Sequence, residues 1–435
     1  MKSRLIRLAV VSMLAGAAIG LVGAAFRASL MYADGLRLSM IAVARTHPYA
    51  GWLIPTLIVA MAAALARYLV VRFAPAAAGS GIQNVEAYIR GKMPAGSPAI
   101  TPVKFFGGVL AIGSGLALGR EGPTVQMGAT IGTIAAKALV KEDADRRVVA
   151  AACAGAGLAV AFNAPVGGAV FVFEELATGF SHDLLVATLG AATVAVAVMR
   201  RLLGNRFDFL VRPGEAFPEH RLVLFLVLGI LLGALGALYN ATILASLRFN
   251  DRLVNVPMVI RAALIGAGVG LLSWFAPNIV GSGEAVTQAV FSNWVTVGTL
   301  AAVFLARFLI GPWSYAALTP GGLFSPMLLV GATFGAVFAA ALNYVVPTLG
   351  LSLVSFAVVG MVALFSASVR APLTGIVLAV EMTGRGDLIL AMLAAALGAM
   401  VVATLLKSPP IYESLENRTL ANAAPGNAAS AAKGL

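Results

Sequence analysis

Charged residues are scarce in this sequence. Asp, Glu, Lys and Arg together make up 11% of the 435 residues, whereas hydrophobic residues make up 60%. A soluble globular domain with this composition would have too few polar side chains to cover its surface. The composition therefore predicts an integral, multi-pass membrane protein whose apolar exterior contacts the lipid bilayer.

Cysteine and histidine are also rare, with one Cys and three His residues. The lone Cys153 forms no disulfide within the chain and is expected in the core. The histidines, at positions 47, 182 and 220, lack the spacing of metal ligands. Ser80 has no plausible histidine base in the apolar segments, and no acids are paired at metal spacing, so an intramembrane hydrolase has no support. We predict that the protein is not an enzyme and needs no cofactor.

The chain is basic, with a formal net charge of +12 at pH 7. Its Lys and Arg residues are spread over loops, where the enrichment of cytoplasmic loops in basic residues explains them, so we predict no nucleic-acid partner. Lys2, Arg4 and Arg7 precede an apolar run that is longer than the core of a signal peptide, which favours a retained first helix. Apolar runs that can span a membrane lie at about residues 8–32, 51–71, 183–199, 221–247, 259–277, 297–311 and 387–406.

Three sequence blocks occur twice, in the same order and at nearly the same spacing. Residues 73–81, Phe-Ala-Pro-Ala-Ala-Ala-Gly-Ser-Gly, return at 275–283 as Phe-Ala-Pro-Asn-Ile-Val-Gly-Ser-Gly, an offset of 202 (275 − 73). Gly-Arg-Glu-Gly-Pro at 119–123 matches Gly-Leu-Phe-Ser-Pro at 322–326, an offset of 203 (322 − 119). The third block recurs at an offset of 207 (371 − 164) and comprises Ala164, Gly168 and Glu174, matched by Ala371, Gly375 and Glu381.

These blocks indicate an internal duplication. We predict a first membrane repeat at residues 1–205, a linker at 206–220 and a second membrane repeat at 221–418. Residues 419–435, rich in Ala, Asn and Ser, are predicted to form a disordered tail.

Basic residues flank only one copy of each block. Residues 64–92 contain four Lys or Arg residues, whereas the equivalent 266–294 contain none. Residues 133–150 also contain four, whereas 336–353 contain none. Because basic loops mark the cytoplasmic side, equivalent loops are expected on opposite faces of the membrane. The predicted fold is an all-α polytopic membrane protein with two inverted-topology repeats and broken, re-entrant helices.

Each Gly-rich block precedes an apolar helix. The start of a helix exposes unpaired N–H groups and about half a positive charge, and glycine allows an ion to approach the backbone. Inverted repeats direct several such helix starts toward one point, which replaces the hydration shell of an anion without trapping it beside a full positive charge. The alternative is that these glycines serve only helix packing.

The same blocks resemble those of the CLC family of chloride channels and chloride/proton antiporters. The resemblance rests on Gly-Ser-Gly-Ile at 79–82, Gly-Arg-Glu-Gly-Pro at 119–123, Gly-Leu-Phe-Ser-Pro at 322–326 and the late Tyr412, and it extends over roughly residues 8–419. It implies one anion path in each subunit, a homodimer, and an integral membrane location, expected to be the bacterial inner membrane.

The resemblance also implies roles for individual residues. Glu121 matches the gating glutamate, and Glu175, the second acid of Phe-Glu-Glu, matches the internal proton-accepting glutamate of the antiporters. Ser80 and Tyr412 match the residues whose hydroxyls bind the central anion. The complete set of anion-binding positions is Ser80, Gly81, Ile82, Gly122, Leu323, Phe324 and Tyr412.

One departure concerns the first block. The family pattern Gly-Ser-Gly-Ile-Pro-Glu is Gly-Ser-Gly-Ile-Gln-Asn here, with Gln83 in place of proline. Without the proline, the first turn of the helix after Ser80 is expected to differ.

Glu121 also indicates its function without the resemblance. An ionisable residue in a membrane segment is costly and is usually functional. Ionised, Glu121 can occupy an anion site as a tethered competitor; protonated, it loses the charge that holds it there. The alternative is a helix-capping acid paired with Arg120.

The leading hypothesis is a secondary active transporter that exchanges chloride for protons. Its nearest rival is a passive chloride channel, gated by voltage or pH, on the same scaffold. Glu175 favours exchange, because an antiporter needs a second acid where the proton leaves the anion path. The simpler alternative places the pair Glu174 and Glu175 at the aqueous end of a segment.

Overall fold

The protein is helical in nearly all of the residues that the computed structural model describes, which are 2–47, 49–177, 179–211, 218–292 and 296–423. The helices of the first half are α1 (Lys2–Ala44), α2 (Leu53–Phe73), α3 (Ile82–Ile89), α4 (Ile100–Ser114), α5 (Glu121–Leu139), α6 (Asp143–Phe162), α7 (Pro165–Phe171) and α8 (His182–Leu203). Those of the second half are α9 (Leu222–Arg252), α10 (Met258–Phe275), α11 (Glu284–Phe291), α12 (Val297–Tyr315), α13 (Phe324–Val345), α14 (Leu353–Val369), α15 (Pro372–Thr383) and α16 (Ile389–Leu405). They are followed by α17 (Ile411–Ala423).

Eight helices within these described ranges are long and apolar enough to cross a membrane. The seven predicted apolar runs each overlap one of these helices, and α13 is the eighth. Other helices are short because glycine or proline interrupts the chain. For example, α3 and α11 each begin directly after a left-handed glycine, Gly81 (φ 87°) and Gly283 (φ 92°).

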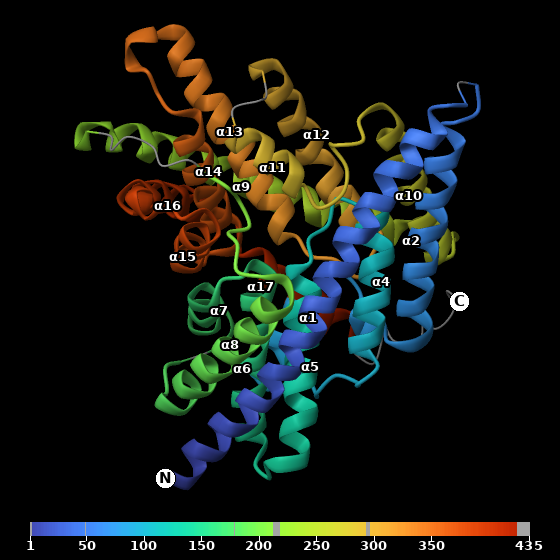
Figure 1. Cartoon of the computed structure of the whole chain (residues 1–435), viewed down its shortest axis with the longest axis vertical. Helices are drawn as coiled ribbons and strands as arrows, with labels where there is room; N and C mark the ends of the chain where they lie inside the picture. Colours follow the sequence, from blue (N-terminus) through green and yellow to red (C-terminus); the bar gives the residue numbers. More distant parts are fainter. Residues whose placement is uncertain (1, 48, 178, 212–217, 293–295, 424–435) are drawn as a thin grey trace.

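The second half repeats the helices of the first half in the same order, and equivalent helices point in opposite directions. In the first half α1 packs on α8 and α5 on α6; in the second, α9 packs on α16 and α13 on α14. Helices α5 and α13 begin near each other in the middle of the molecule and run toward opposite ends of it (Figure 1). This arrangement confirms the predicted inverted-topology repeats.

Helices α6 and α14 form the centre of the molecule. Every residue from Ser355 to Val369 of α14 is buried, and so is the α6 segment from Val149 to Phe162. Many of these residues are Ala, Gly or Ser, which allow neighbouring helices to approach closely. Cys153 lies in this buried segment, as expected. The broken helices therefore start inside protein, where their free N–H groups do not face lipid.

The segment between the halves packs against the second repeat. The N–H of Phe209 donates to the carbonyl of Met382 (3.0 Å), and the N–H of Leu210 donates to Gln288 Oε1 (2.9 Å). Residues 212–217 of the predicted linker lie outside the described residues.

Helix α17 extends to Ala423, so the prediction of a disordered tail is wrong for residues 419–423. The helix is held because it packs on α3 and because its buried Glu416 pairs with Arg90 (2.9 Å) and Lys92 (2.8 Å). The rest of the predicted tail, 424–435, lies outside the described residues.

Candidate functional site

The Gly-rich breaks of the two repeats meet through main-chain hydrogen bonds. The N–H of Gly119 donates to the carbonyl of Gly322 (2.8 Å), and the N–H of Gly322 donates back to the carbonyl of Gly119 (2.7 Å). The N–H of Gly321 donates to the carbonyl of Gly79 (3.0 Å). These bonds bring together the starts of α3, α5 and α13, whose first N–H groups have no partner within their own helices.

Ser80 lies where these helix starts meet. It is fully buried, and its hydroxyl has no hydrogen-bond partner among the described residues. Gly122 approaches so closely that a Cβ atom added to it would lie 2.4 Å from Ser80 Oγ. Gly122 is therefore needed at this position, because any side chain there would collide with Ser80.

Tyr412, near the start of α17, has a second buried hydroxyl without a partner among the described residues. It lies within electrostatic range of Glu121 and of Tyr315, whose hydroxyl accepts the N–H of Ser80 (3.3 Å). A buried hydroxyl that has no protein partner is free to donate a hydrogen bond to an anion. Ser80 and Tyr412 thus both offer hydroxyls in the region where the sequence predicts the anion.

Glu121, the first residue of α5, is fully buried. Its carboxylate accepts hydrogen bonds from the hydroxyl of Ser325 and from the N–H of Ser325 (3.4 Å), at the start of α13. The ion pairs of Arg120 are instead with Asp208 (3.1 Å) and Glu284 (2.9 Å). The gate candidate is therefore held by the other repeat and forms no ion pair with Arg120.

Three further predicted anion-binding residues are buried and lie at the starts of helices. Ile82 begins α3, Leu323 directly precedes α13, and Phe324 begins it. The ring of Phe324 packs against the rings of Phe162 (centroids 5.4 Å apart) and Phe365 (4.3 Å). This packing fixes the main chain at the start of α13.

The side chain of Gln83 binds a main-chain N–H group at the start of α3. Its side-chain Oε1 accepts the N–H of Gly81 (3.1 Å), and the helix still begins at Ile82. Asn84 Nδ2 also donates to the carbonyl of Ala76 (2.8 Å). A proline at position 83 could not make this bond, because it has no side-chain acceptor.

Glu174 and Glu175 have different environments although they are adjacent. The carboxylate of Glu174 accepts the N–H groups of Leu373 (3.0 Å) and Thr374 (2.6 Å) at the start of α15. Glu381, its counterpart in the second repeat, accepts the N–H of Gly167 (2.7 Å) at the start of α7. Glu174 is thus one of two reciprocal caps related by the repeat symmetry.

Glu175 takes no part in these caps. It lies in a single π-helical turn, Val172–Leu176, and its side chain contacts the buried Glu86. Its carbonyl accepts a hydrogen bond from Arg90 (3.1 Å), which also reaches α17 through Glu416. The sequence prediction that singled out Glu175 did not include Glu86.

Sequence reasoning also missed two buried cations that hold the duplicated Gly-Ser-Gly loops. Lys104 Nζ donates to the carbonyls of Gly79 (2.7 Å) and Ser80 (2.9 Å). Arg307 donates to the carbonyls of Gly281 (2.7 Å) and Val280 (3.3 Å). The two cations occupy equivalent positions, at an offset of 203 (307 − 104), and this signal was present in the sequence.

Helix starts from two inverted repeats that meet around unpartnered hydroxyls and a buried carboxylate define a membrane transport protein with its site at the repeat interface. The chain belongs to the voltage gated chloride channel family, whose profile matches residues 62–404.

Named relatives and solved structures agree with this assignment. The chain is 38% identical over 422 residues to the H+/Cl− exchange transporter ClcA of Vibrio parahaemolyticus, covering 95% of this chain and 90% of that protein. It is 37% identical over 414 residues to ClcA of Cronobacter sakazakii, covering 94% and 89%. A crystal structure of a slow cyanobacterial Cl−/H+ antiporter superposes with a TM-score of 0.91 at 33% identity and covers 96% of this chain and 99% of that one.

Proposed function

We propose that the protein exchanges chloride for protons across a bacterial inner membrane. The observation that carries the proposal is the position of Glu121, whose buried carboxylate takes the N–H and hydroxyl of Ser325 at the start of α13. A carboxylate held by helix-start donors occupies a position that suits an anion. Names of relatives such as ClcA, an H+/Cl− exchange transporter, support the same activity.

Chloride would bind on the inner side of Glu121, between the hydroxyls of Ser80 and Tyr412. Main-chain N–H groups at the starts of α3 and α13, from Ile82, Leu323 and Phe324, would complete its shell, whereas the N–H of Gly81 is already bound by Gln83 Oε1. All of these donors are neutral, so the anion can leave again. Gly122 would leave room for the anion beside Ser80 because it has no side chain.

Glu121 would couple the two ions. When ionised, its carboxylate competes with chloride for donors; when protonated, the side chain loses its negative charge and releases the position to an anion. Each passage of chloride past Glu121 therefore requires a proton on this side chain. Such coupling makes one residue serve both as gate and as proton carrier.

Glu175 would accept the proton on the inner side, away from the anion. A proton and an anion that share the inner path would pass together instead of being exchanged, so a separate acid is needed. Glu174 is already bound to the start of α15, which leaves Glu175 as the acid of this pair that is available for proton transfer.

The proposal is tested with purified protein in proteoliposomes. The vesicles are loaded with chloride and start with the same pH inside and outside. Chloride efflux should then drive proton uptake into the vesicles, which a pH-sensitive dye measures. Chloride movement without any proton movement would instead support a passive channel.

We also propose a homodimer, which light scattering of the detergent-solubilised protein would detect as twice the mass of one chain.

A further inference from the structure

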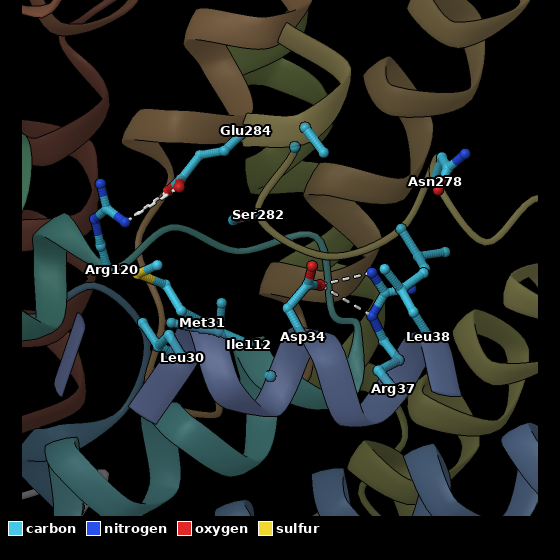
Figure 2. Close-up of a pocket in the computed structure, with 14 residues that line it drawn as sticks. Leu30, Met31, Asp34, Arg37, Leu38, Ile112, Arg120, Asn278, Ser282 and Glu284 are labelled. Carbon is cyan, nitrogen blue, oxygen red and sulfur yellow. Dashed lines mark hydrogen bonds and ion pairs between the residues drawn. The ribbon is translucent and has the colours of Figure 1, made fainter. Parts of the chain in front are cut away.

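A cavity of about 330 Å³ opens beside Arg120 and is called here the outer vestibule. Its lining includes Asp34 and Arg37 of α1, Arg120, and Ser282 to Glu284 before and at the start of α11. Figure 2 shows the pair Arg120 and Glu284 at one end of the vestibule and the pair Asp34 and Arg37 at the other. The loop that leads into α11 belongs to the segment 266–294, which contains no Lys or Arg. Because basic loops mark the cytoplasmic side, the vestibule lies on the opposite face of the membrane.

Arg120 is a fixed cation in the wall of this vestibule. Its side chain is only 6% exposed, and its Nε donates to the carbonyl of Ala161 (2.9 Å). Its Nη2 pairs with Asp208 (3.1 Å), which is 5% exposed and also bound by Arg27. These partners are buried, so they hold the guanidinium in place whatever happens on its other side.

Glu284 covers the remaining side of the guanidinium. Both of its carboxylate oxygens approach Arg120 Nη1, at 2.9 Å and 3.2 Å. In contrast to Asp208, the Glu284 side chain is 38% exposed. Because its carboxylate is partly exposed, the attraction of Glu284 for Arg120 is screened by water and salt more than that of the buried Asp208, so Glu284 is the displaceable partner.

The pair lies between the vestibule and the gate. A second, smaller cavity of about 10 Å³ shares Arg120, Gly283 and Glu284 with the vestibule and is also lined by Ser325. Ser325 is the residue that binds the carboxylate of Glu121. Arg120 and Glu284 therefore line both the vestibule and the small cavity that adjoins the Ser325 donor of Glu121.

We propose that Arg120 Nη1 is an outer binding subsite for a small monovalent anion such as a halide, and that the Glu284 carboxylate is its tethered occupant. An anion arriving from the vestibule displaces Glu284, while Asp208 and Ala161 keep Arg120 in position. Glu284 thus lowers the affinity of the outer face for chloride. This inference rests on the proposed anion transport, and it assigns Glu284 a role separate from proton coupling.

Three variants distinguish a Glu284 side chain that competes with the anion for Arg120 from a general effect of negative charge in the vestibule. E284Q removes the charge, and E284D keeps the charge but shortens the side chain so that it cannot reach Nη1 in the same way. D34N removes one negative charge from the opposite wall of the same vestibule, where Asp34 binds Arg37 (2.6 Å). If Glu284 must reach Arg120 to compete, E284D and E284Q should show the same half-saturating chloride concentration. If only the local charge matters, E284D should match the wild type and D34N should match E284Q.

Chloride transport is measured in right-side-out and inside-out membrane vesicles, so that chloride is varied on one face at a time. For E284Q and E284D, the half-saturating chloride concentration should fall about threefold on the vestibule face, as expected for loss of a half-exposed ion pair, and stay unchanged on the other face. An equal change on both faces, or the same change in D34N, would overturn the proposal.

A second measurement does not depend on transport. Crystals of E284Q soaked in bromide should show anomalous scattering beside Arg120 Nη1, while wild-type crystals at the same bromide concentration should not. No bromide there in E284Q would refute the subsite. Wild-type protein that moves chloride without protons would refute only the exchange mechanism, because both readouts of the subsite follow the anion alone.

Discussion

The hydroxyl of Ser325 donates a hydrogen bond to the carboxylate of Glu121, although 204 positions separate the two residues in the chain. Each residue is at the start of its helix, Glu121 in α5 and Ser325 in α13, and the two helices belong to opposite repeats. The carboxylate that we propose as the gate belongs to one repeat and is therefore held by donors of the other. Any change in the fit between the repeats should alter gating.

Replacing Glu121 by Gln should uncouple the two ions. The amide carries neither the negative charge that competes with chloride nor a proton that can be transferred. Chloride flux should continue, while proton flux should fall about a hundredfold or more, as expected for loss of a positioned proton-transfer group. Simultaneous chloride-electrode and pH recordings on proteoliposomes measure both. E142Q, at an exposed residue before α6, is the control and should keep the wild-type ratio.

Replacing Ser325 by Ala should weaken the hold on the ionised Glu121. A hydrogen bond to a charged group contributes about 1.5–3 kcal/mol, so the carboxylate should compete less well and apparent chloride affinity should rise about tenfold. Proton coupling should persist, since Glu121 is intact. S366A is a suitable control, because the Ser366 hydroxyl bonds only a carbonyl of its own helix, that of Val362 (2.7 Å). Unchanged affinity in S325A would show that this bond does not restrain the gate.

Replacing Gly122 by Ala should damage the central anion site. The new Cβ would lie 2.4 Å from Ser80 Oγ, so Ser80 must move or the helices must separate. Overpacking of this kind costs about 1–3 kcal/mol, which predicts roughly tenfold weaker chloride binding by isothermal titration calorimetry. G35A should bind normally, because no atom lies within 4 Å of the position that its Cβ would take. Wild-type binding by folded G122A would place the anion elsewhere.

The adjacent acids Glu174 and Glu175 should give opposite results. E175Q should abolish proton transport and leave chloride binding near Ser80 intact, because Glu175 takes no part in holding helices together. E174Q weakens the cap on α15, where three donors reach the carboxylate, and should lower the free energy of unfolding by about 1–3 kcal/mol while proton coupling persists. Thermal unfolding and proton flux distinguish them. Loss of coupling in E174Q alone would reverse the assignment.

The class of the protein and its repeat architecture could be predicted from the sequence because both depend on local composition. Scarce charge indicated membrane helices, the recurrence of Gly-Ser-Gly at 79–81 and 281–283 indicated duplication, and basic residues on one copy only indicated inversion. Each signal depends only on residue identities along the chain, and it does not require knowing which residues meet in space. The same is true of Glu121, since an acid at the start of an apolar helix in a membrane protein is rare and usually functional.

The partners of these residues were decided only by the tertiary structure. Sequence reasoning did not indicate that Ser325 would bind Glu121, that Glu174 would cap α15, or that Glu284 would cover Arg120. The alternative in which Glu121 pairs with Arg120 is wrong, because Arg120 pairs with Asp208 and Glu284. Contacts of this kind join residues far apart in the chain, and they depend on how the two inverted repeats pack. Periodicity within a segment reports which face of a helix is buried, but the packing of the repeats determines what that face meets.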